Sequence, residues 1–427
     1  MRAREARVIR EQETIVLLES DAPSELLRSA LATAGWELVS WQPGPLHHRP
    51  GAGVTGIFSL EVRRSSDRDG RKEPVPVPVP THACITSCSI AHPATRVEVF
   101  HRRGADPLSV WVHPADPLLP GLPLALDPLR VTPFAFGSEH DPSETMIETR
   151  SYRPLRRAVV LVRNGDDRRY LKVLRRHESG PLAERHRMLR AAGVPAPALT
   201  REPVQDVVAM HPAPGTPLAE LLMRDGASDV DPSALVRVLT SLPPAILGLP
   251  ARQPWSARVR DYAEGAVAAL PAEALRIRRL AAAIDDLVRS SDAGPLVPTH
   301  GDFYEGNLLI TDGAVSGLLD VDMLGPGHLV DDLACFLGHI AVLPGLHAGY
   351  AYVPSALLQF LRAFDRHVDP VALRSRAAAV SLTLIAGARR GAADTDGAGE
   401  ALSRLEIAEQ FLAEAWTLGS QRERRSG

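Results

Sequence analysis

The chain of 427 residues has few cysteines, few lysines and no long apolar run, and these shortages exclude whole classes of protein. Three cysteines, Cys84, Cys88 and Cys335, cannot form an even disulfide framework, so we expect a reducing compartment. No stretch reaches the roughly 18 apolar residues that a membrane-spanning helix requires. The first residues carry charges but no apolar segment, so no secretory signal is visible. Together these features predict a cytoplasmic protein without a membrane partner.

Neither sign of charge dominates the sequence. The formal net charge is −3 and basic residues are dispersed among acidic ones, so we expect no nucleic-acid partner. The one basic run, Arg422 to Arg425, is explained better by a solvated chain end than by a phosphate-binding arm. Apolar residues make up 45% of a chain that is too long for one ordinary core, which predicts two or three globular domains.

Two of the cysteines belong to a pattern that must be weighed as a metal site, His82-x-Cys84-x₃-Cys88-x₃-His92. Its nitrogen and sulfur atoms are ligands that zinc accepts. The spacing differs from that of a zinc finger, however, and the small residues between the cysteines favour a strand or a turn. A zinc site is therefore the less favoured interpretation.

The most informative stretch is Val297 to Ala334, which holds seven carboxylates, one asparagine and two histidines around two short apolar runs. Between those runs, Asp312-Gly313 is a strong signal for a two-residue hairpin turn. Such a hairpin places Asn307 opposite Leu318, with Asp320 diagonally beside Asn307 on the same face. Both side chains then offer oxygen to one hard cation such as Mg²⁺.

Upstream of the hairpin, Asp302 precedes Asn307 by the five positions that separate base and metal ligand in the kinase catalytic loop. Asp302 is the candidate base for the substrate hydroxyl, and Asp320 is the candidate main ligand of a metal that bridges nucleotide phosphates. His300 is expected to pack and orient the loop. Asp322 either joins the metal site or caps the next turn.

These residues resemble the aminoglycoside phosphotransferase and choline kinase superfamily, whose pattern is HGDxxxxN followed by IDxxxxGxGxxxxDLA. The matching positions are His300-Gly301-Asp302, Asn307, Leu319-Asp320, Gly325, Gly327 and Asp332-Leu333-Ala334. His328 departs from the pattern, because many members have Asp there, and this bears on substrate class more than on reaction type. The resemblance implies a kinase-like fold that uses ATP or GTP with Mg²⁺. Asp332 is expected to anchor the catalytic loop, whereas Asp331 is a favourable charge at a helix N-terminus.

A small antiparallel lobe is predicted for residues 141–210, with strands over 146–152, 157–162 and 169–174. Lys172, one of two lysines in the chain, lies in an apolar strand, where it either binds the nucleotide phosphates or points outward. Glu184, on the helix predicted over 182–192, would orient Lys172 by an ion pair. The alternative is that Glu184 is an ordinary solvated residue of this helix.

A buried strand over 207–210 resembles the hinge between kinase lobes. Met210 then lies beside the adenine of the nucleotide, or it is ordinary core. No GxGxxG motif is present, so the turn near residues 151–156 is expected to cover the phosphates. Residues 211–427 are predicted as a helical lobe that contains the catalytic loop, residues 300–322, with helices over 232–242 and 257–290 among others.

Residues 1–140 are predicted as an added α+β cap that the resemblance does not cover. A helix is expected over 25–34, strands over 56–63, 95–101 and 108–113, and an irregular proline-rich connection over 114–128. The fold class is therefore α+β: a protein-kinase-like fold with a small antiparallel β lobe and a helical C-terminal lobe, preceded by a small α+β cap domain.

The expected function is that of a small-molecule kinase, which moves the γ-phosphoryl group of ATP to a hydroxyl of a sugar, amino alcohol or related metabolite. After Ala334, nine acidic residues accompany ten arginines, which disfavours a polycationic aminoglycoside as acceptor without excluding it. One alternative is a kinase-shaped nucleotide-binding regulatory module without turnover. Another is a metal hydrolase that uses His300, Asp302, Asp320 and Asp322.

Overall fold

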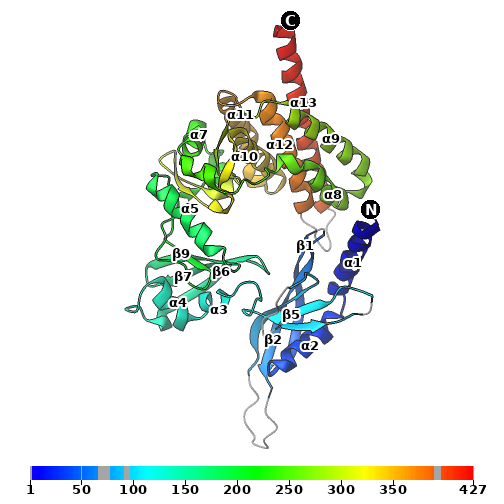
Figure 1. Ribbon diagram of the computed structural model, residues 1–427, viewed down its shortest axis with the longest axis vertical. Coiled ribbons are helices and arrows are strands. Elements are labelled where there is room, and N and C mark those ends of the chain that lie inside the picture. Colours follow the sequence, from blue (N-terminus) through cyan, green and yellow to red (C-terminus); the bar gives the residue numbers. More distant parts are fainter. Residues whose placement is uncertain are drawn as a thin grey trace, which may run out of the picture. The chain divides into compact units, whose positions relative to one another are not determined.

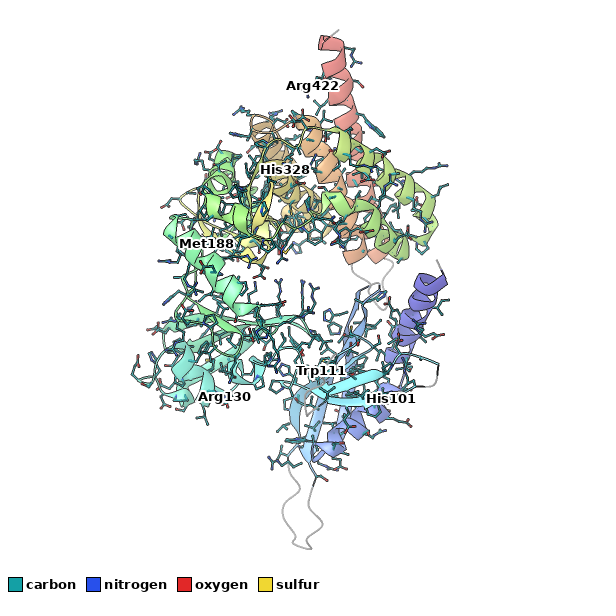
Figure 2. All side chains as sticks on the ribbon, viewed as in Figure 1. His101, Trp111, Arg130, Met188, His328 and Arg422 are labelled. Carbon is teal, nitrogen blue, oxygen red and sulfur yellow. The ribbon has the colours of Figure 1, made fainter. Side chains whose placement is uncertain are left out.

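The computed structural model describes residues 2–49, 51–65, 77–90, 97–102, 104–388 and 396–426 of the chain. The chain divides into two compact units. The first comprises residues 1–183 and 199–211, and the second comprises residues 184–198 and 212–427. Figure 1 labels several elements of each unit, and Figure 2 adds the side chains.

The first unit begins with two helices and a five-stranded antiparallel sheet of order β1-β2-β3-β5-β4. These elements are α1 (Arg2–Leu18), α2 (Pro23–Thr33), β1 (Trp36–Arg49), β2 (Gly53–Arg64), β3 (Val79–Thr86), β4 (Val97–Phe100) and β5 (Leu108–Val112). Leucines of both helices pack against one face of the sheet and form its core. The mixed α+β character predicted for this region is confirmed.

The sequence pattern does not predict α1 or β1. β1 contains Pro43 and Pro45, which cannot donate backbone hydrogen bonds, and its pairing with β2 is irregular between Pro43 and Leu46. β1 tolerates both prolines because it is the edge strand of the sheet, where one side needs no partner.

A second antiparallel sheet in the first unit has the order β6-β7-β8-β9. Its strands are β6 (Thr145–Arg153), β7 (Arg157–Asn164), β8 (Asp167–Leu174) and β9 (Val207–Met210). One face packs against α3 (Leu122–Ala125) and α4 (Pro128–Ala135) in a shared apolar core. The antiparallel sheet is confirmed. The irregular connection expected over 114–128 is wrong in part, because leucines in it form α3 and are buried against the sheet.

The second unit is mainly helical, as predicted. Its helices include α6 (Leu218–Asp225), α7 (Pro232–Thr240), α8 (Val259–Ala269), α9 (Ala274–Ser290), α10 (Leu329–Val342), α11 (Val353–Phe364), α12 (Pro370–Leu384) and α13 (Asp396–Ser426). The single helix expected over 257–290 is wrong: it is two helices, because Pro271 interrupts the backbone hydrogen bonds between α8 and α9. α5 (Ser179–Ala191) begins in the first unit and ends in the second.

Two small antiparallel sheets of the second unit frame the predicted catalytic loop. β11 (Leu296–Thr299) pairs with β14 (Gly325–His328), and β12 (Leu308–Thr311) lies between β10 (Thr216–Pro217) and β13 (Ala314–Leu318). The β12–β13 turn is the predicted one, since Asp312 and Gly313 have φ angles of 50° and 72°. Positive φ at both central residues is what a type I′ turn requires.

The predicted register of this hairpin is wrong by one residue. Leu308, not Asn307, is the partner of Leu318, because the pairing shifts after Leu309 and leaves Ser316 without an opposite residue. The hydroxyl of Ser316 instead donates to the Pro214 carbonyl at 2.8 Å and accepts from the Thr311 hydroxyl at 3.0 Å. Such a bulge is stabilised by these two bonds and re-aims the residues that follow it.

Neither a membrane helix nor a metal cluster is found in the parts of the chain that the structure describes. No described helix is long and apolar enough to cross a membrane. Within the same residues, no group of three or more His, Cys, Asp or Glu side chains is placed to hold a metal ion. For the zinc pattern, Cys84 is fully buried with its Sγ atom 3.7 Å from the Tyr152 hydroxyl, and His92 lies outside the described residues.

Candidate active site

The predicted catalytic loop begins where β11 ends. The hydroxyl of Thr299, the last residue of β11, donates to the Gly325 carbonyl of β14 at 2.8 Å. Gly301 follows with a φ of +81°, and a Cβ atom there would lie 2.7 Å from the Met323 carbonyl oxygen. Only glycine fits this position without strain, so Gly301 sets the direction in which the chain enters Asp302.

Asp332 anchors the loop, as the sequence predicts. Its carboxylate accepts the backbone N–H of His300 at 2.7 Å and that of Gly301 at 2.8 Å. Asp332 lies in the first turn of α10 and is 2% exposed. Burial raises the pKa of its carboxyl group to about 7, while the two backbone donors act in the opposite direction.

The imidazole of His300 joins the loop to the far end of the hairpin. Its Nε2 atom lies 2.9 Å from the Leu319 carbonyl oxygen, and its Nδ1 atom accepts the backbone N–H of Asp302 at 3.3 Å. These bonds require the proton on Nε2. His300 is completely buried, so its predicted packing and orienting role is confirmed. A metal hydrolase would need His300 as a ligand, and both nitrogens are already engaged with the backbone.

The backbone of Leu319 links Asn307 to Asp320. The Asn307 side-chain NH₂ donates to the Asp302 carbonyl at 2.9 Å, and its backbone carbonyl accepts the Leu319 N–H at 2.8 Å. Asp320, the next residue, has φ 53° and ψ 53°, a left-handed conformation that is uncommon for residues with a side chain. Non-glycine residues held in this region are concentrated at functional sites.

The donor set of these residues suits a hard cation. Asn307 is 5% exposed and uses its NH₂ group within the loop, so its amide oxygen is the atom that can face an ion. Together with the Asp320 carboxylate it supplies oxygen only, which is what Mg²⁺ takes from proteins that share it with phosphate. Asp322 interacts electrostatically with the buried Arg185.

Lys172 is located in the first unit. It lies in β8 between Val159 of β7 and Val208 of β9 and is 6% exposed. Its neighbours Leu171 and Val173 face α3 and α4, so Lys172 points to the opposite face of the sheet. Met210, two residues from Val208, shares that face. A solvent-exposed lysine is therefore the wrong interpretation.

The predicted ion pair between Lys172 and Glu184 stays a prediction, because the two residues belong to different compact units. In the second unit, Glu184 pairs with Arg187 one turn along α5.

One residue of the loop that the sequence did not indicate is Glu305. It lies between Asp302 and Asn307 and is 7% exposed, and its Oε2 atom has no hydrogen-bond partner among the residues that the structure describes. Burial raises the pKa of its carboxyl group to about 7. The preceding residue, Tyr304, stacks on His339 of α10 with 4.5 Å between ring centroids. No periodicity or motif marks Glu305, because only tertiary packing buries it.

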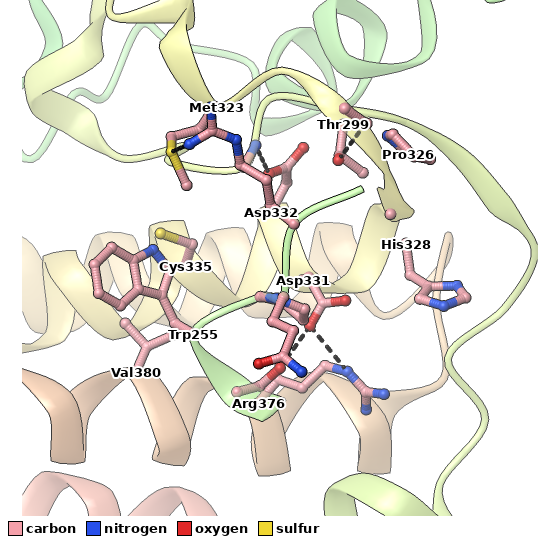
Figure 3. A pocket seen from close by; sticks show the side chains of 17 residues that line it. Trp255, Thr299, Met323, Pro326, His328, Asp331, Asp332, Cys335, Arg376 and Val380 are labelled. Carbon is pink, nitrogen blue, oxygen red and sulfur yellow. Dashed lines mark hydrogen bonds and ion pairs between the residues drawn. The ribbon is translucent and has the colours of Figure 1, made fainter. Parts of the chain in front are cut away.

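A pocket lies directly against the catalytic loop (Figure 3), with Gly301 and Asp332 in its wall. The figure also shows Asp331 bonded to Arg376. Asp331 lies 3.2 Å from the Arg376 guanidinium and accepts the Ser256 hydroxyl at 2.8 Å. Besides its position at the helix N-terminus, Asp331 therefore ties α10 to α12. His328, at the pocket edge, bonds the Gly294 carbonyl through Nδ1 at 3.0 Å.

A family model described as the phosphotransferase enzyme family matches residues 155–376, which is just over half of the chain. The chain belongs to this family. The matched residues of the phosphotransferase run from the β6–β7 turn through Lys172 and the whole catalytic loop into α12. The predicted family is thus confirmed, and so is its kinase-like α+β fold class.

Solved structures with a similar chain course have low sequence identity. A choline/ethanolamine kinase family protein from Mesorhizobium loti is 15% identical, with a TM-score of 0.44, over 64% of this chain and 92% of that one. An aminoglycoside phosphotransferase from Alicyclobacillus acidocaldarius is 16% identical, with a TM-score of 0.44, over 67% and 95%. A spectinomycin phosphotransferase in complex with ADP and spectinomycin is 12% identical, with a TM-score of 0.44, over 68% and 96%. A comparison with curated proteins gives no match.

Proposed function

We propose that this phosphotransferase moves the γ-phosphoryl group of ATP to a hydroxyl group of a small metabolite, such as a sugar or an amino alcohol. The observation that carries the proposal is the arrangement of the catalytic loop around Leu319. His300 and Asn307 bond the backbone of Leu319 from two sides, and Asn307 also bonds Asp302. One bonded unit thereby holds a candidate base beside a pair of oxygen ligands.

Asp302 is the base in this proposal. Its carboxylate accepts the proton of the acceptor hydroxyl while that oxygen attacks the γ-phosphorus in line with the leaving oxygen. The backbone of Asp302 is held from both sides, by the His300 ring at its N–H and by the Asn307 amide at its carbonyl. Such preorganisation lowers the cost of aligning base and nucleophile.

Asn307 and Asp320 would hold Mg²⁺. When bound, the ion supplies positive charge that neutralises the nucleotide phosphates and the charge developing during transfer. Lys172 would add a second positive charge at the α- and β-phosphates, oriented by Glu184.

Glu305 is the residue that we assign to the acceptor. Its Oε2 atom, which has no partner within the described part of the chain, lies in the loop between the base and the metal ligand. It would accept a hydrogen bond from an O–H or N–H group of the acceptor, which relieves the cost of leaving a buried polar atom unsatisfied.

The decisive experiment is phosphoryl transfer by the purified full-length chain with ATP and Mg²⁺ over a panel of small hydroxyl compounds, with the phosphorylated product measured by mass spectrometry. The test variant is Asp302→Asn, and the control is Asp312→Asn in the β12–β13 turn, where Asn also tolerates a positive φ. We expect kcat to fall by about 100-fold or more in the first variant only. Equal turnover by Asp302→Asn and wild type would refute the base assignment.

A regulatory module without turnover predicts a different result. Calorimetry would then show Mg²⁺-dependent ATP binding by the wild type, while no hydroxyl compound of the panel gains phosphate.

A further inference from the structure

The turn between β6 and β7 contains a leucine in a conformation that usually requires glycine. The Arg156 N–H donates to the Arg153 carbonyl at 3.0 Å and closes the turn, with Pro154 and Leu155 at its centre. Leu155 has a φ of 62° and is 5% exposed. A positive φ at the second central residue is characteristic of type II turns, where glycine or asparagine normally stands.

Leu155 is held in this conformation on three sides. Its N–H donates to the Asp116 carboxylate at 2.8 Å, and its carbonyl accepts from the Arg175 Nε atom at 2.6 Å. Its side chain packs in a buried cluster with Cys84 and Trp111. A left-handed leucine costs roughly 1 to 2 kcal/mol, so these contacts are what keep the turn in one shape.

The side-chain contacts of Leu155 come from the N-terminal sheet, because Cys84 lies in β3 and Trp111 lies in β5. In β3 and β5, the residues that alternate with Cys84 and Trp111 belong to the core beneath α1 and α2. Cys84 and Trp111 therefore lie on the opposite face of that sheet, and this face receives Leu155. The five-stranded sheet thus has helices on one face and the β6–β7 turn on the other.

Asp116 is the polar part of the same junction. It follows β5, is 5% exposed, and its carboxylate accepts the Tyr152 hydroxyl at 2.9 Å in addition to the Leu155 N–H. The Leu118 N–H donates to the same carboxylate at 2.9 Å. One carboxylate thus bonds both the end of β6 and the centre of the turn. Burial raises the pKa of Asp116, and these hydrogen bonds oppose that shift.

The turn carries positive charge. Arg153 and Arg156 are exposed on it. The pKa of His47 in β1 is lowered mainly by the partial burial of its own ring, and the charges of Arg153 and Arg156 lower it further. Arg157 pairs with Leu174 at the end of the sheet, two residues from Lys172 along β8. This separation is roughly 7 Å along a strand. Cations gathered at one end of a sheet attract a polyphosphate.

We propose that the N-terminal sheet positions the β6–β7 turn for the nucleotide phosphates, with Asp116 as the positioning residue. This inference rests on the proposed function. A turn that is already ordered loses less conformational freedom when ATP binds, and this turn carries the positive charges of Arg153 and Arg156. The N-terminal sheet, which contains none of the predicted catalytic residues, gains a role in the affinity for nucleotide.

The test compares Asp116→Asn with Thr86→Val in the full-length protein. The amide introduced by Asp116→Asn would place an NH₂ group among groups that are themselves hydrogen-bond donors. The turn would then lose hydrogen bonds that residue 116 accepts in the wild type. Thr86→Val removes buried bonds to Thr55, Val54 and Cys88 from the same sheet but leaves every hydrogen bond of Asp116 in place. We expect the Kd of ATP by calorimetry, and the KM for ATP, to rise about tenfold in Asp116→Asn, a difference of about 1.4 kcal/mol, with the acceptor KM unchanged. In Thr86→Val, only the melting temperature should fall.

Tyr152→Phe keeps the ring in place and removes one of the hydrogen bonds to Asp116, so it decides the question if Asp116→Asn does not fold. We expect a smaller rise in the ATP Kd, about threefold. The inference is overturned if folded Asp116→Asn and Tyr152→Phe bind ATP as the wild type does, or if Thr86→Val weakens ATP binding equally. A wild type that binds ATP but transfers no phosphoryl group would refute the proposed function alone. One that does not bind ATP would refute both.

Discussion

Asp332 accepts the backbone N–H of His300 at 2.7 Å across 32 residues of sequence. With the matching bond from Gly301, it fastens the start of the catalytic loop to the first turn of α10. The position of Asp302 therefore depends on a helix that follows the hairpin, and several variants should separate this support from the chemistry itself.

Replacing Asp332 by Asn should loosen the loop. The amide would turn one NH₂ group toward a backbone donor, so we expect a loss of about 1 to 3 kcal/mol in the free energy of unfolding and a clear loss of kcat. Urea denaturation and the transfer assay measure the two effects. Asp331→Asn is the control: it breaks the ion pair with Arg376 and should lower stability while the folded enzyme keeps its kcat. A normal kcat in Asp332→Asn would show that the anchor is dispensable.

Gly301→Ala should misplace the base. The new Cβ atom would lie 2.7 Å from the Met323 carbonyl oxygen at a φ of +81°. We expect kcat to fall by about 100-fold, because displacements on the order of 1 Å have this effect on reacting groups. Gly294→Ala is the matched control for Gly301→Ala, since Gly294 has a similar φ of +73° but open space around the position of a Cβ atom. Both variants should lose similar stability from the left-handed conformation, so comparable kcat losses would contradict the steric argument.

Glu305→Gln should change how stability depends on pH. Burial raises the pKa of Glu305 from 4.5 to about 7, so between these values the folded protein binds a proton that the unfolded chain does not. The wild type must therefore lose stability through this group as pH rises across that window. The glutamine variant lacks this pH dependence. Its free energy of unfolding relative to that of the wild type should therefore rise by on the order of 1 to 3 kcal/mol between about pH 5 and about pH 8.

Denaturation of both proteins at several pH values measures this difference, and contributions from other groups, such as Asp332, cancel in it. The exposed Glu220, changed to Gln, provides the reference and should show no such trend. A flat difference for Glu305→Gln would mean that the carboxyl group has an ionised-state partner in solution.

Asp320→Gly should separate stability from activity. Glycine adopts the left-handed backbone of residue 320 without strain but costs about 0.5 to 1 kcal/mol in chain entropy, so the net change in stability should be within about 1 kcal/mol. Loss of the carboxylate should lower kcat by about 100-fold or more. Asp320→Asn, which also tolerates this conformation, should lose activity as well. Wild-type turnover in both variants would exclude Asp320 as the metal ligand.

Parts of the fold could be predicted because they depend on neighbours in the chain. The alternation of apolar residues indicates β7 and β8, and Asp312-Gly313 forms the expected turn. The register of that hairpin could not be predicted, since the bulge at Ser316 depends on a bond to Pro214, 102 residues away. β1 escaped prediction because its prolines are compatible with a strand only at the edge of a sheet, and edge position is not a local property.

The sequence alone determined the spacing of Asp302, Asn307 and Asp320, the hairpin turn and the membership in a phosphotransferase family, because all of these depend on short segments. Tertiary structure decided which groups are buried and what they bond: burial raises the pKa of Asp332 and that of Glu305, and Asp116, which follows β5, bonds Leu155 in the β6–β7 turn. Burial arises from segments that are distant in the chain, and the free energy of a charge depends on its surroundings more than on its neighbours in sequence.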